Sequence, residues 1–302
     1  MSYPVCDVLG LIVWIFPGIG TVGIVWLIAS YAIVFAVREM WCGRFWPVHQ
    51  DDGYFDEGIA ARYDDDSAEM FDPAILEPVI DFLGEMAGND RVLELGIGTG
   101  RVALPLARRG VQIHGIDLSE AMVAKLRSKP GGGEIDVTIG DFATASVDGP
   151  FALAYLVFNT IGNLTTQDAQ VACFRNVAAH LQPGGRFVIE VEVPQLRRLP
   201  PGEIYRVFES RDGYWGIDEF DVANQGLISH HLSLVDGDLE RFSMPFRYVW
   251  PAELDLMARL AGMELHERWA DGTESRSRAR ATSMCRCGRR WRSPLHRFVR
   301  TR

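Results

Sequence analysis

The sequence predicts an α/β fold with a doubly wound, mostly parallel β-sheet that carries an antiparallel insertion. Between residues 72 and 191, short apolar runs alternate with stretches in which apolar residues recur at helical spacing. Continuous apolar runs are typical of parallel strands that helices cover on both faces, and right-handed crossovers make such a sheet doubly wound. Between residues 202 and 248, Asp-Gly and Gln-Gly turns separate alternating apolar and polar runs, which predicts antiparallel hairpins.

The predicted elements have recognisable start and stop signals. A helix begins at Asp72, which caps it, with Pro73 at the first helical position, and it ends at Gly88. Because ligands bind at the carboxyl ends of parallel strands, the loops after the strands form the candidate site. The predicted strands are 91–95, 111–116, 135–139, 151–157, 186–191 and 263–269, and the other predicted helices are 101–109, 119–127, 166–181 and 251–261.

The first segment predicts a membrane span. Residues 8–37 carry no charge and consist mainly of Leu, Ile, Val, Trp and Phe, and about 20 apolar residues suffice to cross a bilayer as a helix. A secretory signal peptide would need a basic start and a shorter apolar run. Arg38 and Arg44 follow the span and no basic residue precedes it, so the domain after it is expected in the cytoplasm. If the segment is not part of the mature protein, the whole protein is expected to be cytoplasmic.

Charge is unevenly distributed along the chain. The formal net charge is −10, but residues 275–302 hold ten arginines and no acid, so the rest carries close to −20. An acidic body repels phosphate backbones, and nucleic acid is not an expected partner. The five cysteines form neither a disulfide framework nor a zinc-ligand pattern, and we expect no metal. The arginine-rich end predicts a disordered tail over 272–302; a frame-shifted end is an alternative, and the sheet would then lack its last strand.

A glycine-rich turn follows the first predicted strand, with glycines at positions 96, 98 and 100. The NAD fingerprint G-x-G-x-x-G requires a further glycine where this sequence has Arg101. An adenosyl amino acid has no phosphate and needs only the close backbone approach that glycines permit. Asp117 ends the second strand, where a carboxylate can bond ribose hydroxyls in either kind of site. Asp141 follows the third strand and favours an adenosyl group, because it can bond the adenine amino group. Taken singly, each of these residues could instead serve a turn or a helix cap.

Four stretches match a known family in order and spacing: VLELGIGTG at 92–100, GIDLSEAM at 115–122, GDF at 140–142 and QPGGRFV at 182–188. They resemble the successive motifs of class I S-adenosylmethionine-dependent methyltransferases. The resemblance implies a Rossmann-like fold of the seven-stranded type and S-adenosyl-L-methionine as cofactor.

The resemblance also implies roles for residues of the cofactor site. Those that would border the methionine part are Glu94, Gly96, Ile97 and Gly98, and Asp117 would hold the ribose. Around the adenine, the expected residues are Leu118, Met122, Asp141 and Phe142. Tyr63 would lie on an N-terminal helix over the cofactor, and Phe158 would complete the set.

On the acceptor side, residues 158–164 resemble the segment after strand four in small-molecule N-methyltransferases, so a small-molecule amine is the expected methyl acceptor. The candidate acceptor-side groups are Asn159, Glu190, Glu192 and one of the neighbours His230 and His231, with His231 preferred, because adjacent strand residues face opposite ways. Transfer from a sulfonium is an in-line displacement that depends on alignment and exclusion of water more than on a dedicated base.

The predicted organisation is a transmembrane segment at 1–40, a linker at 41–53, a methyltransferase domain at 54–271 and a basic tail at 272–302. An antiparallel lid at 202–248 lies within the methyltransferase domain. The expected activity is S-adenosylmethionine-dependent methyl transfer (EC 2.1.1.-) to a small molecule. Two alternatives stay open: a membrane-tethered module that binds the cofactor without turnover, and an NAD-dependent oxidoreductase.

Overall fold

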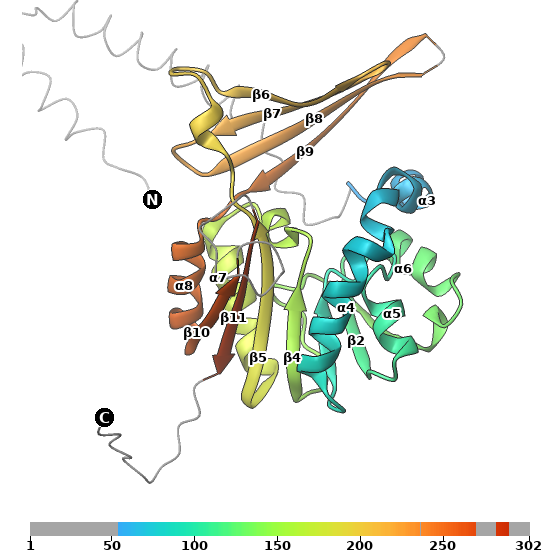
Figure 1. Ribbon diagram of the computed structural model, residues 1–302, viewed down its shortest axis with the longest axis vertical. Helices are drawn as coiled ribbons and strands as arrows, with labels where there is room; N and C mark the ends of the chain where they lie inside the picture. The colour runs from blue at the N-terminus through green and yellow to red at the C-terminus, as the bar shows by residue number, and fades with distance from the viewer. Residues whose placement is uncertain (1–53, 236, 270–281, 290–302) are drawn as a thin grey trace, which may run out of the picture. The chain divides into compact units, whose positions relative to one another are not determined.

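The computed structural model describes residues 54–235, 237–269 and 282–289 (Figure 1). The chain divides into two compact units, Met1–Asp51 and Asp52–Arg302, and all described residues belong to the second. The membrane span predicted at 8–37 lies outside the described residues. Within the part of the chain that is described, no helix has the length and apolar character needed to cross a bilayer.

A seven-stranded sheet forms the centre of the fold, in the order β10-β11-β5-β4-β1-β2-β3. The pairs β1·β2, β2·β3, β1·β4 and β4·β5 are all parallel, which confirms the predicted doubly wound sheet. The strands are β1 (Val92–Leu95), β2 (Ile113–Asp117), β3 (Asp136–Ile139), β4 (Phe151–Leu156), β5 (Leu181–Glu192), β10 (Met263–Trp269) and β11 (Thr282–Arg289).

Helices cover both faces of this sheet and bury two apolar clusters. On one face pack α4 (Pro73–Ala87), α5 (Ala103–Arg108) and α6 (Glu120–Arg127), and on the other α7 (Gln167–His180) and α8 (Pro251–Leu260). Neighbouring residues of β1 show the alternation: Val92 belongs to the cluster under α4, whereas Leu93 belongs to the cluster under α7. The period-2 alternation of a strand thus divides its apolar residues between two cores.

A second, antiparallel sheet lies beyond the carboxyl ends of the parallel strands (Figure 1). It consists of β6 (Tyr205–Arg211), β7 (Tyr214–Asp221), β8 (Gly226–Val235) and β9 (Asp238–Arg247), and we call it the lid sheet. Its turns fall at or beside the predicted Asp-Gly and Gln-Gly signals, and Gln225 adopts a positive φ of 58°. The predicted hairpin insertion is confirmed.

The end of the chain differs from the sequence expectation. Thr282–Arg289 forms β11 inside the segment expected as a disordered tail, and β11 pairs antiparallel with β5 on one side and β10 on the other. The main sheet therefore has the strand whose absence a frame-shifted end would imply. The prediction of disorder rested on charge alone, and backbone pairing between two available strand edges is not visible in charge.

Short helices complete the described fold. A helix that precedes the first predicted element, α3 (Glu57–Asp66), begins with Asp56 as its N-cap, whose side chain accepts a hydrogen bond from the Ile59 amide. Four single turns of 3-10 helix follow along the chain: η1 (Ala68–Phe71), η2 (Gly132–Glu134), η3 (Thr160–Asn163) and η4 (Leu196–Arg198).

Candidate active site

The glycine turn after β1 is bonded directly to the acid at the end of β2. Gly98 N donates to Asp117 Oδ2 over 2.6 Å, and Ser119 N donates to Asp117 Oδ1 over 2.9 Å. Gly96, Gly98 and Gly100 all have positive φ, at 67°, 54° and 82°. This backbone conformation favours glycine. The carboxylate and the side-chain-free bend thus lie together at the carboxyl edge of the sheet.

Asp117 is 9% exposed, and burial raises the pKa of its carboxyl while the Ser119 and Gly98 amides oppose that shift. A carboxylate oxygen can accept more than one hydrogen bond, so these turn contacts leave acceptor capacity for ribose hydroxyls. Asp117 therefore stabilises the turn, which was one of the two roles that the sequence left open. It also has acceptor capacity left for a cofactor.

Glu94 lies two residues before Gly96, the first glycine of the turn, and is 3% exposed. Tyr155 on β4 donates its hydroxyl hydrogen to Glu94 Oε2 over 2.6 Å. Burial raises the pKa of Glu94 to about 8, with the Tyr155 hydrogen bond and the Arg101 charge acting against it. A buried carboxyl at this edge offers a partner for a cationic group such as a ligand ammonium.

The two remaining cofactor candidates after β2 differ in burial. Leu118 is 38% exposed, whereas Met122 is 4% exposed, and its Cε lies 3.5 Å from the position a Cβ on Gly98 would take. Ile97 is buried and fills the space above Gly115. Met122 and Ile97 thus shape the turn through packing, while Leu118 presents an exposed apolar surface.

Asp141 lies beside the end of β2, because Gly140 N donates to Asp117 O over 2.8 Å. Its Oδ1 accepts from the Ala143 amide over 2.8 Å, which closes a local turn. Phe142 is buried, and its carbonyl accepts from Asn176 on α7. The structure therefore places both acids at neighbouring strand ends, and Asp141 has a turn role in addition to any adenine contact.

Helix α3 is fastened over this site. Ser119 Oγ donates to the Phe55 carbonyl over 2.6 Å, and Lys125 Nζ donates to the Ala61 carbonyl over 3.2 Å. Tyr63 lies in the same helix, and burial raises the pKa of its hydroxyl, with Asp117 and Asp64 adding to the shift and Arg101 opposing it. The charges of Asp117 and Arg101 thus both act on the Tyr63 hydroxyl.

A second attachment joins α3 to the glycine turn itself. Lys129 Nζ lies 2.5 Å from Asp64 Oδ2 and donates to the Thr99 carbonyl over 2.8 Å. Thr99 Oγ1 donates to Asp64 Oδ1 over 2.6 Å. These three residues, which we call the α3 latch, close a ring of contacts between α3, the turn and the end of α6. Sequence reasoning missed the latch, because its members lie 30 or more positions apart without a shared motif.

The turn after β4, which the sequence predicts for the acceptor side, has an unusual backbone. Phe158 and Asn159 have positive φ values of 62° and 56°. Phe158 N donates to Glu190 Oε2 over 2.8 Å, and Asn159 Oδ1 accepts from Glu192 N over 3.2 Å. The Phe158 ring is 40% exposed and carries the Arg101 guanidinium 5.0 Å from its centroid. The Asn159 side chain, the Glu190 carboxylate and the Glu192 backbone amide thus meet at this turn.

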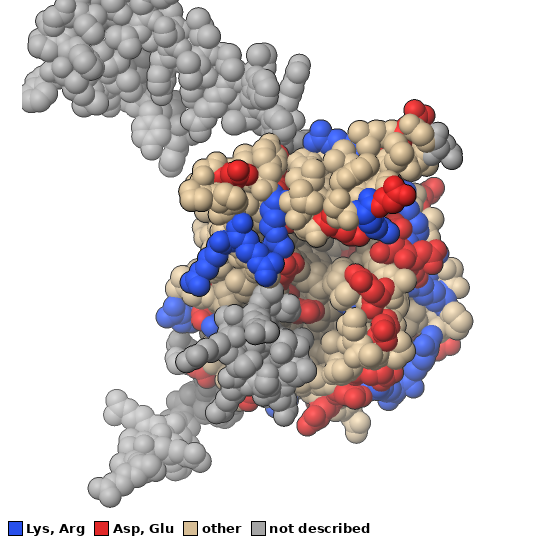
Figure 2. Space-filling view, turned by 45° about the horizontal axis from the view of Figure 1, so that its top comes forward, with Lys and Arg blue, Asp and Glu red and all other residues tan. Residues whose placement is uncertain are grey.

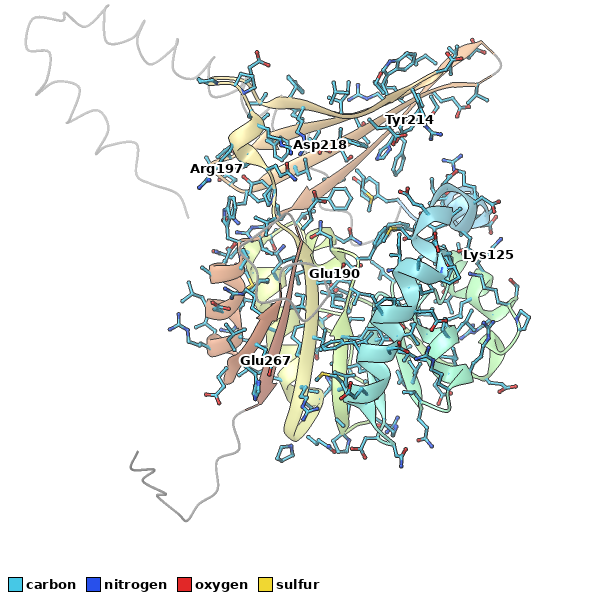
Figure 3. All side chains as sticks on the ribbon, viewed as in Figure 1. Lys125, Glu190, Arg197, Tyr214, Asp218 and Glu267 are labelled. Atoms are coloured by element: carbon cyan, nitrogen blue, oxygen red, sulfur yellow. The ribbon has the colours of Figure 1, made fainter. Side chains whose placement is uncertain are left out.

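The lid sheet turns one face toward this edge. The Phe242 ring contacts the Tyr54 ring at 6.5 Å, and Phe246 approaches Gly162 in η3. Strand register places Asp218, Ser229 and His231 on the same face as Phe242. Figure 3 shows Glu190 at the end of β5, beneath the sheet that carries Asp218 and Tyr214.

His231 lies on this inner face, inside an aromatic cluster formed by Phe208, Tyr214 and Phe242. Its Nδ1 is 2.6 Å from the Tyr214 hydroxyl, and burial lowers the pKa of the imidazole. His230 faces the other way, where its ring nitrogens meet Ser243 and Glu219 at 2.8 and 3.1 Å. Of the two histidines, only His231 is on the face that approaches the acceptor edge.

Asp218 is a further acid on the inner face that sequence reasoning did not single out. Burial raises the pKa of its carboxyl, Glu192 adds to the shift, and the Ser229 hydroxyl and Arg206 oppose it. The Glu192 charge at the end of β5 thus acts on this lid acid. Among the described residues, no group of three or more His, Cys, Asp or Glu side chains could hold a metal ion.

Comparison with known proteins shows that the chain is similar to methyltransferases. A model of a methyltransferase domain matches residues 92–185, which include the glycine turn, Asp117 and Asp141. The CcbJ methyltransferase from Streptomyces caelestis is 35% identical, with a TM-score of 0.69, over 77% of this chain and 96% of that one. The cypemycin N-terminal methyltransferase of a Streptomyces species is 28% identical over 218 residues, which are 71% of this chain and 89% of the relative.

A third comparison concerns the fold alone. The structure of SAM-bound CalS10, an amino pentose methyltransferase from Micromonospora echinaspora, is 23% identical with a TM-score of 0.57, over 80% of this chain and the whole of that one. The match to methyltransferases over nearly the full length of CcbJ decides against an NAD-dependent oxidoreductase. The chain belongs to the class I S-adenosylmethionine-dependent methyltransferases, and S-adenosyl-L-methionine is its cofactor.

Proposed function

We propose that the protein transfers the methyl group of S-adenosyl-L-methionine to a nitrogen atom of a small-molecule amine. The observation that carries this proposal is the acidic acceptor edge: the Glu190 carboxylate and the Glu192 backbone amide bond the turn at Phe158 and Asn159, and the Glu192 charge acts on Asp218 of the lid. Carboxylates beside the acceptor attract a cationic amine, whereas they repel a phosphorylated or carboxylated acceptor.

The surface charge supports the same acceptor class. Figure 2 shows acidic side chains gathered on the body below the lid. The whole chain has a net charge of −10 despite its arginine-rich end. An acidic surface steers cations toward the site and disfavours polyanions such as nucleic acids.

The cofactor residues fit an adenosyl amino acid. The glycines permit close backbone approach, Asp117 offers acceptors for ribose hydroxyls, and Glu94 offers an acceptor for the ammonium. The bound cofactor supplies a methyl group on a sulfonium sulfur. This sulfur is a good leaving group, because it departs as a neutral thioether. The protein's own tasks are to align the amine lone pair with that methyl group and to exclude water.

The acceptor must present a neutral nitrogen, because a protonated amine has no lone pair to attack with. His231 suits the removal of that proton, since burial lowers the pKa of its imidazole and keeps it neutral at physiological pH. When the N–CH3 bond forms, the C–S bond breaks and the sulfur keeps the electron pair. The methylated nitrogen then carries the positive charge that the sulfonium had.

The amine assignment is supported by one relative. The cypemycin N-terminal methyltransferase carries nitrogen chemistry in its name, and it aligns over most of both chains. The segment 158–164, which resembles N-methyltransferases in sequence, supports the same assignment, because it includes the turn that the Glu190 carboxylate bonds.

The test is a methyl-transfer assay on matched acceptors. The purified full-length chain is incubated with S-adenosyl-L-methionine and pairs of compounds that differ only in carrying an amine or a hydroxyl at one position, starting with amino sugars and amino-terminal peptides. Mass spectrometry locates the added methyl group. We expect it on nitrogen, with S-adenosylhomocysteine as co-product. Methylation of the hydroxyl partner alone would refute the amine assignment, and cofactor binding without product from any pair would favour the binding module without turnover.

Membrane attachment through residues 8–37, with the catalytic domain in the cytoplasm, stays a proposal from the sequence. Fractionation of cells that express the full-length chain tests it: the methyltransferase is expected in the membrane pellet and resistant to extraction with high salt. Recovery in the soluble fraction would contradict this prediction.

A further inference from the structure

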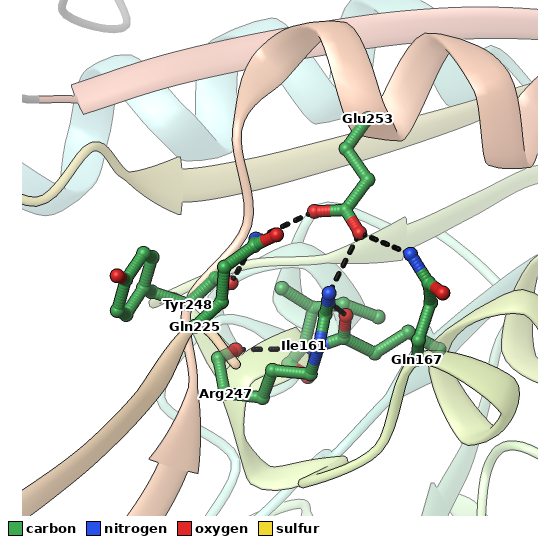
Figure 4. A network of polar contacts seen from close by, with 7 residues as sticks. Ile161, Gln167, Gln225, Arg247, Tyr248 and Glu253 are labelled. Atoms are coloured by element: carbon green, nitrogen blue, oxygen red, sulfur yellow. Dashed lines mark hydrogen bonds and ion pairs between the residues drawn. The ribbon is translucent and has the colours of Figure 1, made fainter. Parts of the chain in front are cut away.

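A buried amide on α7 bonds two segments that are far apart in sequence. Gln170 is 0% exposed, and its Nε2 donates to the Ile161 carbonyl over 3.2 Å and to the Arg247 carbonyl over 3.0 Å (Figure 4). Ile161 belongs to η3, directly after the turn at Phe158, and Arg247 is the last residue of β9 in the lid sheet. One side chain therefore bonds both the acceptor-side turn and the base of the lid.

The Arg247 side chain completes the connection. Its guanidinium is 6% exposed and donates to Gln170 Oε1 over 2.5 Å and to Glu253 Oε1 over 2.7 Å. Glu253 on α8 also accepts from Gln225 in the β7–β8 turn over 2.7 Å and from Gln167 over 2.8 Å. Burial alone would raise the pKa of Glu253, but these three donors outweigh it and lower the pKa. The buried Arg247 charge is thus paired with Glu253, which also bonds the β7–β8 turn of the lid.

The acceptor-side turn also contacts the glycine turn after β1. A Cβ on Gly96 would lie 2.7 Å from Thr160 Cγ2, so the Thr160 side chain occupies the space that a side chain at position 96 would need. Ile161 O accepts from Leu164 N as well as from Gln170, and Gly162 N donates to Asn159 O over 2.9 Å. The contacts run without a gap from the lid base through Gln170 and η3 to the glycine turn.

We propose that Gln170 and Arg247 are positioning residues that hold the acceptor-side turn, residues 158–163, in register with the lid. The proposed amine acceptor lies between these two parts, so their relative position sets the distance from its nitrogen to the methyl group. The acceptor identity rests on the proposed function, whereas the coupling of turn and lid does not. Gln170 suits this task because an amide is both donor and acceptor, and each polar group here is buried and costly to leave unpaired.

The decisive variant is Gln170→Glu. A carboxylate keeps the acceptor for Arg247 but has no hydrogen to give to the two carbonyls, so it breaks the link to the turn and leaves the ion pair. Gln167→Ala is the matched control, because Gln167 lies on the same helix and bonds the same Glu253 but does not touch the turn. Both are made in the full-length chain and compared with saturating S-adenosylhomocysteine.

Hydrogen exchange of the amides at 158–164 is the first readout, since it requires no acceptor. We expect Gln170→Glu to raise their exchange about tenfold, as the loss of one to two hydrogen bonds implies. The affinity for S-adenosylhomocysteine should stay within about twofold, because the glycine turn itself is intact. With an amine acceptor, the acceptor KM should rise and kcat should fall. Gln167→Ala should match the wild type throughout.

Arg247→Lys is the second variant and covers the case in which Gln170→Glu does not fold. A lysine keeps the buried charge beside Glu253 but cannot bond Gln170 and Glu253 together with fixed geometry. It should raise exchange at 158–164 to an intermediate level. Unchanged exchange at these amides in whichever variants fold would overturn the coupling. Raised exchange with unchanged kinetics on a methylated amine would overturn the positioning role. A wild type that methylates no amine, together with raised exchange in the variants, would refute the acceptor and leave the coupling intact.

Discussion

The Tyr155 hydroxyl donates a 2.6 Å hydrogen bond to Glu94 inside the core, one residue from the end of β1. Because burial raises the pKa of Glu94 to about 8 from a usual value of 4.5, the folded protein holds a proton there that the unfolded chain releases. Folding stability therefore falls as pH rises between these values, since the native state binds more protons.

Glu94→Gln should remove this pH dependence. The neutral amide has no proton to lose, so the free energy of unfolding of the variant, relative to the wild type, should rise steadily from pH 5 to pH 8. Urea unfolding of both proteins at a series of pH values measures it. Tyr155→Phe serves as a control: it removes the hydrogen bond that lowers the pKa of Glu94, so its window should extend to higher pH. If the free energies of unfolding of the wild type and Glu94→Gln ran parallel from pH 5 to pH 8, the Glu94 carboxyl would be ionised in the folded protein over this range, which would contradict the prediction.

Asp117→Ala should weaken the binding of S-adenosylhomocysteine. The carboxylate would lose its bonds to ribose hydroxyls, and the Gly98 and Ser119 amides would lose their acceptor. Hydrogen bonds to a charged group contribute about 1.5–3 kcal/mol each, so an affinity loss of at least tenfold is expected by calorimetry. Asp136→Ala, on the exposed side of β3, is the control and should bind as the wild type does. Full affinity in Asp117→Ala would mean that this acid serves the turn alone.

Apart from β11, the strands of the main sheet were predictable from sequence, because each carries a local signal. The predicted strand 91–95 is mostly apolar and is followed by glycines, and the structure has a strand at Val92–Leu95. Asp117 and Asp141 were also predictable as neighbours, since consecutive parallel strands end at one edge. Their hydrogen bonds to Gly98 and Ala143 were not, because turn geometry decides them.

Other parts of the site carry no local signal. In the sequence, Gln170 and Arg247 look like ordinary polar residues on a helix and at a strand end. Both are buried, and they bond each other across 77 positions of sequence. Charge indicated disorder at the end of the chain, whereas β11 is paired there on both edges. In each case the deciding interaction joins distant segments, and periodicity does not report such contacts.

Lys129→Met should speed the release of S-adenosylhomocysteine. It opens the α3 latch, because Asp64 loses its cation and the Thr99 carbonyl loses a donor, while the long apolar side chain keeps most of the packing. The dissociation rate, measured by stopped-flow fluorescence or surface plasmon resonance, should increase several-fold. In the wild type, added salt should have a similar but smaller effect, since both side chains are partly shielded from solvent.

Lys125→Met is the matched control for the latch. Lys125 also reaches from α6 to α3, but its contact is the exposed Ala61 carbonyl and it does not touch the glycine turn. If both variants release the ligand equally fast, then general loosening of α3 accounts for the change and the latch has no separate role.

Gly96→Ala should impair both folding stability and cofactor binding, for two separable reasons. The residue has a φ of 67°, a conformation that costs an L-residue about 1–2 kcal/mol, and its Cβ would lie 2.7 Å from Thr160 Cγ2. Thr160→Ser removes that methyl group and keeps the hydroxyl that donates to Val157 O. The double variant should therefore recover the part of the loss that comes from the clash and retain the part that comes from strain.

Gly131→Ala isolates the strain, because Gly131 has a φ of 84° with no atom within 4 Å of the position that a Cβ would take. Chemical unfolding of the wild type, Gly96→Ala, Thr160→Ser and the double variant gives the coupling energy between positions 96 and 160. Strict additivity would contradict the close approach of the acceptor-side turn to the glycine loop, on which the positioning role of Gln170 depends.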